Sequence, residues 1–351
     1  MPTTLIDVAH RAGVSLATAS RVLNGSTRSV TPVLRQRVLA AAEALAYVPN
    51  AHAQALARAS TATIGVIVHD MSDPYFSEIL RGVQQAASAG ERLVMVCNSY
   101  RDPDRELAYV TLLQSQRVEA LVLAGSGLDD RRYAQRLAAQ VEAFAASGGR
   151  TVFIGRHNVV GDAVIPDNVG GARALGRALI GLGHRRFGLI GGPPLLTTTR
   201  DRFDGFRQAL AEAGLALPPT NVVQGDFTRD GGAAAAVALL AQAPDITAIF
   251  ALNDSMAVGA LAALRERGVQ VPGELSVAGF DDIPVTRDVT PALSTVRVPM
   301  VELGSRAIVL ALEQRETELR VEHLPTEVLL RASTGPAVET GDRRQETGDR
   351  R

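Results

Sequence analysis

Apolar residues near the start of the chain recur with the period of an α-helix. The i, i+3, i+4, i+7 spacing of one helix face is held by Leu5, Val8, Ala9 and Ala12. Thr4 and Asp7 stand three residues apart at its start, as in a capping box, and Gly13 breaks the pattern. Ser15 is placed to cap a second helix, whose inward residues are Ala19, Val22 and Leu23. Its outward face carries Ala17, Thr18, Arg21 and Asn24.

A third helix follows a loop. Thr31 is expected as its N-cap, with Pro32 at the first helical position. The apolar face of this helix consists of Leu34, Val38, Ala41 and Leu45. Three short helices with a glycine turn between the first two predict a helix-turn-helix, whose second helix would enter a major groove of DNA.

From residue 61 the pattern changes to short apolar runs separated by crossovers. The expected strands are Ile64–Val68, Leu93–Cys97, Ala120–Ala124, Thr151–Ile154, Phe187–Ile190, Ala248–Leu252 and Leu275–Phe280. Helical crossovers are expected at Phe76–Ala89, Arg131–Ala145, Gly170–Leu182 and Ser255–Arg267. This alternation predicts α/β structure with doubly wound parallel sheets, and the number of strands favours two similar lobes.

Composition narrows the chemistry. The 351 residues are 46% hydrophobic and 21% charged, as in a soluble globular protein with more than one core. All 36 basic residues are arginine, which excludes a P-loop lysine, a Schiff-base lysine and a lysine general base. Cys97 is the single cysteine, so neither an internal disulfide nor a cysteine-based zinc site can form.

The formal net charge of -1 argues against a nucleic-acid partner when the chain is taken whole. The first sixty residues, however, contain six arginines and only Asp7 and Glu43 as acids, a balance of +4 that leaves -5 for the remainder. Such asymmetry predicts a nucleic-acid-binding module attached to a second unit.

Polar residues follow the expected strands, at the sheet edge where ligands bind in parallel α/β proteins. The first lobe supplies His69, Asp70, Ser72, Asp73, Tyr75, Phe76, Asn98, Tyr100, Gly155 and Arg156. The second lobe supplies Arg200, Arg202, Asn253, Asp254, Asp281 and Asp282. Carboxylate, amide and guanidinium groups beside two aromatic rings can bind hydroxyls and stack on a sugar or a planar ring. Alternatively, Asp254 caps the following helix, Asp282 forms a turn before Pro284, and Arg200 is a solvated charge.

The sequence supports a catalytic site less strongly than a binding site. The chain has no Gly-x-Gly-x-x-Gly after its first strand and no Gly-x-Ser-x-Gly elbow, and its six histidines lack metal-ligand spacing. We therefore expect no enzyme, no cofactor and no metal. Two alternatives stay open: a solute-binding protein, and a cytoplasmic sugar-acting enzyme with Asp281 or Asp73 as base.

The chain resembles the LacI/GalR family of bacterial transcription regulators over nearly its whole length. The N-terminal stretches that carry the resemblance are 4–15, 18–25, and the connector 47–50 with 53–57. Further matching motifs are Ile64–Ile67, Asp73–Phe76, Arg81–Gly82, Gly183–His184, Arg202–Phe206, Asn253–Asp254 and Gly279–Asp282.

The resemblance implies a homodimer whose two helix-turn-helix units read a near-palindromic operator. It implies that the base edges, the phosphates and the backbone of the DNA are contacted by Thr4, Ser15, Leu16, Ala17, Thr18, Ser20, Arg21, Asn24 and Thr31. A hinge helix would include Asn50, Ala53 and Leu56, with Leu56 wedged into the minor groove.

The resemblance also implies a small-molecule effector, a sugar or related metabolite, in the cleft between the lobes. Its contacts would come from Asp73, Tyr75, Phe76, Arg156, Arg202, Asn253 and Asp281. The sequence departs from the family pattern at three positions, which are Gln54 in the hinge, Val298 in the cleft crossover, and Gly155 in place of a common acidic residue.

We therefore expect a regulator that acts in the cytoplasm, is associated with the nucleoid and has no membrane partner. The mode of regulation that we expect is repression of carbohydrate-related genes. The expected parts are a helix-turn-helix domain (1–46), a hinge helix or linker (47–60), a two-lobed periplasmic-binding-protein-like domain for effector binding and dimerisation (61–334), and a disordered tail (335–351). Lobe 1 would take about 61–160 and 293–323, and lobe 2 about 161–292 and 324–334.

Overall fold

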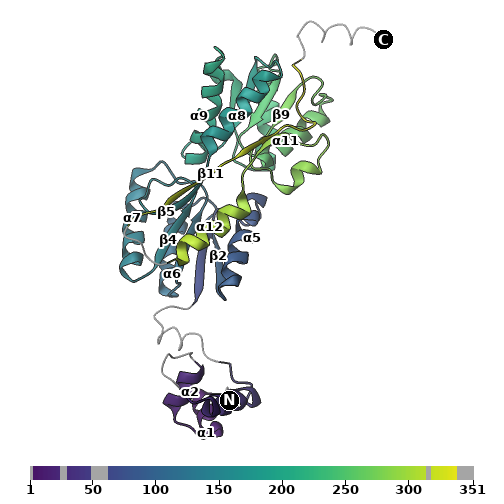
Figure 1. Ribbon diagram of the computed structural model, residues 1–351. Helices are drawn as coiled ribbons and strands as arrows, with labels where there is room; N and C mark the ends of the chain where they lie inside the picture. The colour runs from purple at the N-terminus through teal and green to yellow at the C-terminus, as the bar shows by residue number, and fades with distance from the viewer. Residues whose placement is uncertain (1–2, 24–29, 49–61, 314–317, 338–351) are drawn as a thin grey trace. The chain divides into compact units, whose positions relative to one another are not determined.

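A computed structural model describes residues 3–23, 30–48, 62–313 and 318–337 (Figure 1). It divides into two compact units, an N-terminal helical unit and a larger α/β unit, which are described separately. The expected hinge residues, and Asn24, lie outside the described residues.

The N-terminal unit consists of three helices, α1 (Leu5–Ala12), α2 (Leu16–Leu23) and α3 (Pro32–Ala44). The capping box predicted at Thr4 is present, because the Asp7 amide donates to the Thr4 hydroxyl and the Asp7 carboxylate accepts from the Thr4 amide. Gly13 ends α1 at a φ of 62°, in the left-handed region that glycine adopts without steric cost. Thr31 is the N-cap of α3, although its side chain makes no capping hydrogen bond.

A small core holds these helices together. Its buried residues are Val8, Ala9, Ala12, Ala19, Val22, Val38, Ala41 and Ala42. The predicted inward residues Leu23, Leu34 and Leu45 are only partly buried, so small side chains form the centre of the unit.

The α/β unit contains two parallel sheets, which define its two lobes. The six-stranded sheet of the first lobe has the order β11-β5-β4-β3-β1-β2. Its strands are β1 (Thr63–Val68), β2 (Leu93–Asn98), β3 (Ala120–Ala124), β4 (Arg150–Ile154), β5 (Asp162–Pro166) and β11 (Val321–Leu324). Its helices are α5 (Pro74–Ala89), α6 (Pro103–Ser115), α7 (Arg131–Ala146) and α12 (Met300–Leu312).

The second lobe has a four-stranded sheet in the order β7-β6-β8-β9. Its strands are β6 (Phe187–Gly191), β7 (Val222–Gln224), β8 (Ala248–Ala251) and β9 (Ser276–Ala278). Its helices are α8 (Asn168–Gly181), α9 (Thr197–Glu212), α10 (Arg229–Gln242) and α11 (Asp254–Glu266), with short 3-10 turns at Pro219–Asn221 and Pro284–Arg287. Beside it, β10 (Thr295–Arg297) pairs antiparallel with β12 (Glu327–Leu329).

The strand assignments differ from the expected lobe boundaries at two places. β5 falls in the range expected for the second lobe but pairs with β4 and β11, and an Arg150–Asp162 ion pair of 2.9 Å fixes it there. β10 falls in a range expected for the first lobe, yet its backbone bonds to the end of the second sheet, where the Asp281 amide donates to the Val296 carbonyl over 2.8 Å.

The end of the chain also departs from expectation. Residues expected in the disordered tail are bonded to the second lobe, because the Ala337 amide donates to the Leu182 carbonyl over 2.9 Å. Cys97 lies on the edge strand β2 and is half-buried.

Helix α12 returns to the first lobe and packs tightly on α5 (Figure 1). Glycines permit this approach, since a Cβ at Gly82 would lie 1.9 Å from the Val301 carbonyl oxygen, and one at Gly304 would lie 2.1 Å from that of Ile79. Helix α12 is therefore packed closely against α5, the first helix of the lobe.

Candidate functional site

The exposed face of α2 is the first candidate site. Leu16 is 49% exposed, Ala17 and Arg21 are also exposed, and Thr18 is half-buried. The Ser15 hydroxyl accepts the Thr18 amide over 3.2 Å and lies 2.9 Å from the Thr18 hydroxyl. Capping by Ser15 thus sets the start of α2, while Leu16, Ala17 and Arg21 stay accessible.

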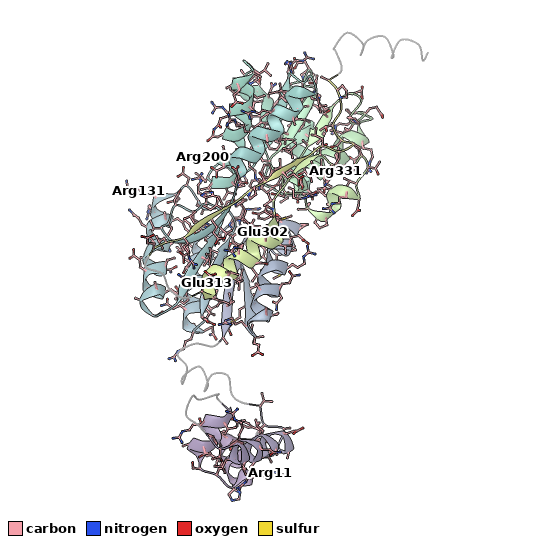
Figure 2. All side chains as sticks on the ribbon, in the orientation of Figure 1. Arg11, Arg131, Arg200, Glu302, Glu313 and Arg331 are labelled. Atoms are coloured by element: carbon pink, nitrogen blue, oxygen red, sulfur yellow. The ribbon has the colours of Figure 1, made fainter. Side chains whose placement is uncertain are left out.

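The other predicted DNA-contacting residues have different surroundings. The Thr4 hydroxyl donates to the Asp7 carboxylate over 2.7 Å, so it is engaged within α1's capping box. Ser20 lies half-buried on α2, and Thr31 is exposed at the start of α3. Arg11 lies on α1 in the same unit (Figure 2).

A pocket lies between the two lobes of the α/β unit, with an empty volume of about 490 Å³ that includes the part open to solvent. The first lobe contributes the ends of strands and the start of α5, and the second lobe contributes α8, α9 and the ends of β8 and β9. The lining residues are His69, Asp73, Tyr75, Phe76, Arg101, Gly125, Ser126, Gly155, Pro166, Asn168, Leu196, Thr198, Arg202, Phe227, Asn253 and Asp281. A lining of aromatic rings with a few polar groups is typical of a small-molecule site.

The start of α5 forms the first-lobe wall. Asp73 is its N-cap, with a carboxylate that accepts the Tyr75 amide over 3.0 Å. Burial raises the pKa of Asp73, and it also raises the pKa of Tyr75. The rings of Tyr75 and Phe76 meet edge to face at 5.1 Å. A helix cap therefore places one carboxylate beside two aromatic rings.

Arg202 and Asp281 form the buried polar centre of the second-lobe wall. Arg202 is 3% exposed and donates to the Asp281 carboxylate over 2.7 Å, to the Asn168 amide oxygen over 2.9 Å, and to the Leu252 carbonyl over 2.6 Å. Its guanidinium also lies 3.9 Å from the centroid of the Phe280 ring. Burial raises the pKa of Asp281, and the guanidinium of Arg202 opposes this shift. All three nitrogen atoms of the Arg202 guanidinium are thus hydrogen-bonded, and these contacts orient the Asp281 carboxylate.

Asn253 completes this wall. It caps α11 through its side-chain oxygen, which accepts the Met256 amide over 2.9 Å, and its amide nitrogen donates to the Phe227 carbonyl over 3.1 Å. The neighbouring Asp254 is the first residue of α11 and not its cap. Asn253 holds Phe227 against the pocket.

Arg156 does not line the pocket. Its guanidinium binds the Asp201 carboxylate on α9 through two hydrogen bonds, of 3.0 and 2.6 Å. Two further contacts join the lobes nearby, a 2.6 Å hydrogen bond from Ser126 to Thr198 and an ion pair between Arg200 and Asp129. The structure therefore brings six of the seven predicted effector residues to the pocket and places Arg156 in an inter-lobe ion pair.

Ten of the lining residues were not among the predicted effector contacts, and four of them have side chains with clear roles in the pocket. His69 follows β1, and burial lowers its pKa to about 3. Arg101 follows β2, Asn168 begins α8, and Phe227 precedes α10. The rule that ligands bind after strand ends had already drawn attention to His69, and applied to the end of β2 it would also have found Arg101.

Comparison with known proteins identifies both units. Residues 4–50 match the family described as "Bacterial regulatory proteins, lacI family", and residues 177–334 match "Periplasmic binding protein-like domain". The transcriptional regulator GalS of Salmonella typhimurium is 40% identical over 313 residues, which cover 88% of this chain and 89% of GalS. The chain belongs to the LacI family of bacterial regulatory proteins.

Other relatives support the same family assignment. GalR of Escherichia coli is 37% identical over 88% of each chain. Among solved structures, a lac repressor dimer bound to operator and an anti-inducer matches with a TM-score of 0.84 at 27% identity, covering 95% of this chain and all of that one. A CelR–cellobiose complex matches with a TM-score of 0.69 at 33% identity, covering 94% and 99%. The chain is thus a DNA-binding transcription regulator, and both the predicted fold class and the predicted function are confirmed.

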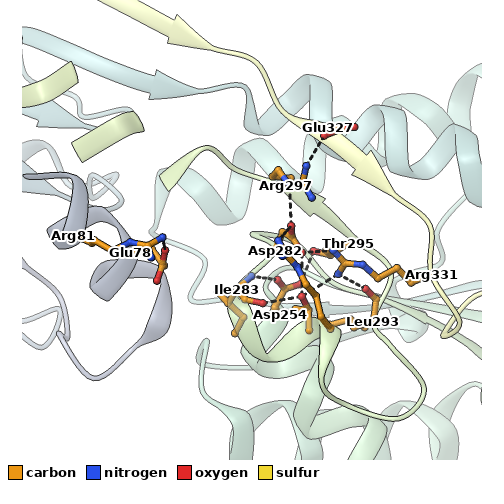
Figure 3. Close-up of polar contacts among 12 residues, drawn as sticks. Glu78, Arg81, Asp254, Asp282, Ile283, Leu293, Thr295, Arg297, Glu327 and Arg331 are labelled. Carbon is orange, nitrogen blue, oxygen red and sulfur yellow. Dashed lines mark hydrogen bonds and ion pairs between the residues drawn. The ribbon is translucent and has the colours of Figure 1, made fainter. Parts of the chain in front are cut away.

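A second acidic residue of this LacI-family chain links three segments behind the pocket. The Asp282 carboxylate accepts from Arg331 over 2.5 Å and from Arg297 over 2.9 Å, and Arg287 lies 3.3 Å away (Figure 3). Beside it, Asp254 accepts the Thr295 hydroxyl over 2.6 Å and the Ile283 amide over 3.0 Å. Asp282 is therefore more than a turn residue, because it anchors β10 and the segment after β12.

Within the described ranges, no group of three or more histidine, cysteine, aspartate or glutamate side chains could hold a metal ion. A search of the same residues for a helix long and apolar enough to cross a bilayer also finds none.

Proposed function

We propose that this regulator represses carbohydrate-related genes by binding a near-palindromic operator as a homodimer. Each copy places α2 in a major groove, where Arg21 makes a bidentate contact with guanine and the apolar Leu16 and Ala17 meet thymine methyl groups. Ser15, Thr18, Ser20 and Thr31 contact base edges or the backbone around them. The observation that carries the proposal is the exposure of this α2 face in a chain that also has a pocket between two lobes.

The effector we propose is a sugar or a related small metabolite held in that pocket. Tyr75 and Phe76 offer ring faces and edges, while Asp73, Asn253, Arg202 and Asp281 offer hydrogen-bonding groups. Relatives of similar fold have been solved with cellobiose and with ribose, which supports a carbohydrate class.

Effector binding is coupled to DNA through lobe closure. Because the pocket takes residues from both lobes, a ligand stabilises one relative arrangement of the lobes. In a dimer, that arrangement sets the spacing of the hinge segments, 47–60, on which operator binding depends. A coupling of about 1–3 kcal/mol is typical of such systems. The regulator acts in the cytoplasm, at the nucleoid.

The direct test is a fluorescence anisotropy titration of the full chain with palindromic DNA from near its own gene. We expect at least a 100-fold preference over random DNA at physiological salt, and a change in that affinity on adding the effector. Equal affinity for both DNAs would refute the proposal.

A further inference from the structure

The charged groups that line the pocket balance one another. Arg202 is paired with Asp281 at 2.7 Å, and although burial raises the pKa of Asp281, the neighbouring guanidinium favours its ionised form. His69 is 7% exposed and carries no charge at neutral pH, because burial lowers its pKa to about 3. The remaining lining charges are the carboxylate of Asp73 and the guanidinium of Arg101.

Arg101 extends from the first lobe to the second. It lies between β2 and α6 with a φ of 60°, and the preceding turn is fixed by a 2.7 Å hydrogen bond from the Tyr100 amide to the His69 carbonyl. Its terminal nitrogen donates to the Asp226 carbonyl over 3.4 Å, and its guanidinium lies 5.5 Å from the centroid of the Phe227 ring. Its Nε is buried and has no hydrogen-bond partner among the described residues. A buried donor without a partner is costly, so a ligand acceptor at this point would be favourable.

Three carboxylates act on this guanidinium, namely those of Asp73, Asp226 and Asp70. Arg101 is therefore not a free positive charge, although an arginine in a ligand pocket often indicates a phosphate site. A phosphate monoester would bring a charge of about -1.5 to -2 into a partly buried space that has no unbalanced cation to receive it. A hydroxyl group both donates and accepts, so adjacent hydroxyls match an acceptor at Asp73 and a donor at Arg101.

We infer that the pocket selects a neutral polyhydroxyl ligand over its phosphate ester, and that Arg101 determines this specificity by donating its Nε–H to the ligand. The inference rests on the proposed effector function and names the ligand class of that same site.

Calorimetric titration of the full chain with matched pairs tests the ligand class. The probes are D-glucose, D-galactose, D-fructose and D-ribose, each beside its own phosphate monoester. We expect at least one neutral sugar to bind and its ester to bind at least tenfold more weakly. An ester that binds as tightly as its neutral partner would overturn the inference while supporting the proposed function. If neither sugars nor esters bind, the proposed sugar effector is itself refuted, and the inference with it.

Variants of Arg101 test the residue. Arg105 is the matched control, because it belongs to the neighbouring turn of the same segment, is exposed, and lies 5.3 Å from the Tyr100 ring without lining the pocket. We expect Arg101→Ala to lower the affinity for the neutral sugar at least tenfold. We expect Arg105→Ala to keep that affinity within threefold of the wild-type value. Arg101→Lys keeps the charge but lacks the Nε–H, and we expect it also to bind at least fivefold more weakly. Wild-type affinity in Arg101→Lys would exclude donation from Nε, and a wild-type far-ultraviolet circular dichroism spectrum with a wild-type unfolding midpoint in each variant checks folding.

Discussion

Asp281 and Asp282 are adjacent, yet their carboxylates bind arginines on different parts of the structure. Asp281 accepts from Arg202 at the pocket. Asp282 accepts from Arg297 on β10 and from Arg331 after β12 (Figure 3). Both residues have positive φ values, 123° and 59°, which turn the two side chains apart. The pocket wall is thus joined through one peptide unit to β10, which leads into α12, and to the segment after β12. We therefore expect a ligand that moves Asp281 to act also on β10.

Arg202→Ala is expected to abolish the effector response while leaving operator binding intact. The change leaves the Asp281 carboxylate buried without its cation, which costs about 3–5 kcal/mol of unfolding free energy. Urea unfolding measures that loss, and operator titrations with and without effector measure the response. Arg207→Ala is the control, since Arg207 is on the same helix with a side chain that is 61% exposed. A wild-type effector response in Arg202→Ala would remove this residue from the binding site.

Arg21→Ala is expected to lose about 1–3 kcal/mol of discrimination between operator and random DNA. Arg21 is exposed on α2 and contributes to the +4 charge of the first sixty residues. Because that charge meets phosphates, operator affinity should also fall steeply with salt, and less steeply in the variant. Anisotropy titrations at several salt concentrations measure both quantities. Equal losses on operator and random DNA would show that Arg21 contacts only phosphate.

Acidification is expected to destabilise the α/β unit through His69. Its pKa in the folded state is about 3, against 6.5 as its ordinary value, so the unfolded chain binds the proton more readily. Its stabilising contribution is present above pH 6.5 and is lost as the pH falls towards 3. Arg101 and His157 add to the lowering, while Glu106 lies 4.0 Å from the ring. Between pH 7 and pH 5 the loss is about 2 kcal/mol.

Urea unfolding at both pH values, on wild type and His69→Gln, checks this expectation. The variant should lose about 2 kcal/mol less than wild type over the interval. An identical pH dependence in both proteins would mean that His69 does not cause the loss.

Much of the fold was predictable because its elements have strong local signals. The capping box of Thr4 and Asp7, Gly13 and the continuous apolar runs each specify an element without reference to distant residues. The elements that were not predicted are the strands β5, β7, β10, β11 and β12 and the helices α6, α9, α10 and α12. α9 and α10 show why, since polar residues begin α9 and a run of alanines fills α10, and neither gives a clear apolar stripe. Their positions depend on packing between distant segments.

The site was predictable as far as the strand-end rule and the family resemblance extend. Both point to Asp73, Arg202, Asn253 and Asp281, which the structure places around one pocket. Arg156 shows the limit, because its partner Asp201 is 45 residues away on a helix that the sequence pattern did not reveal. Which residue a guanidinium binds depends on three-dimensional proximity.

A double-mutant cycle on Arg156 and Asp201 separates two roles for Arg156. If Arg156 affects effector affinity only through this inter-lobe ion pair, Arg156→Ala and Asp201→Asn should change the affinity equally, and the double variant should show no further change. If Arg156 contacts the ligand, Arg156→Ala should bind the effector more weakly than Asp201→Asn does, and the effects of the two substitutions on affinity should add. From the 3.0 and 2.6 Å hydrogen bonds we expect the non-additive result, measured by calorimetry.

Met95→Glu is expected to disrupt the proposed homodimer. Leu93 and Met95 are 73% and 41% exposed on one face of β2, the strand at the end of the first sheet. An exposed apolar edge strand is avoided in monomers because it invites pairing, so a second copy is the partner that we expect to cover it. The negative charge introduced at Met95 should lower the unfolding free energy of a monomer by only about 0.5 kcal/mol or less. In the dimer the same charge would be buried without a cation to pair with, which opposes association.

Sedimentation velocity measures the change, with Val160→Glu as the control because Val160 is 79% exposed in the loop between β4 and β5. We expect a monomer for Met95→Glu and a dimer for Val160→Glu. The monomer should also bind operator more weakly, since it presents one α2 where the palindrome has two half-sites. If Met95→Glu stays dimeric, the copies associate through another surface, and the operator affinity should then equal that of wild type.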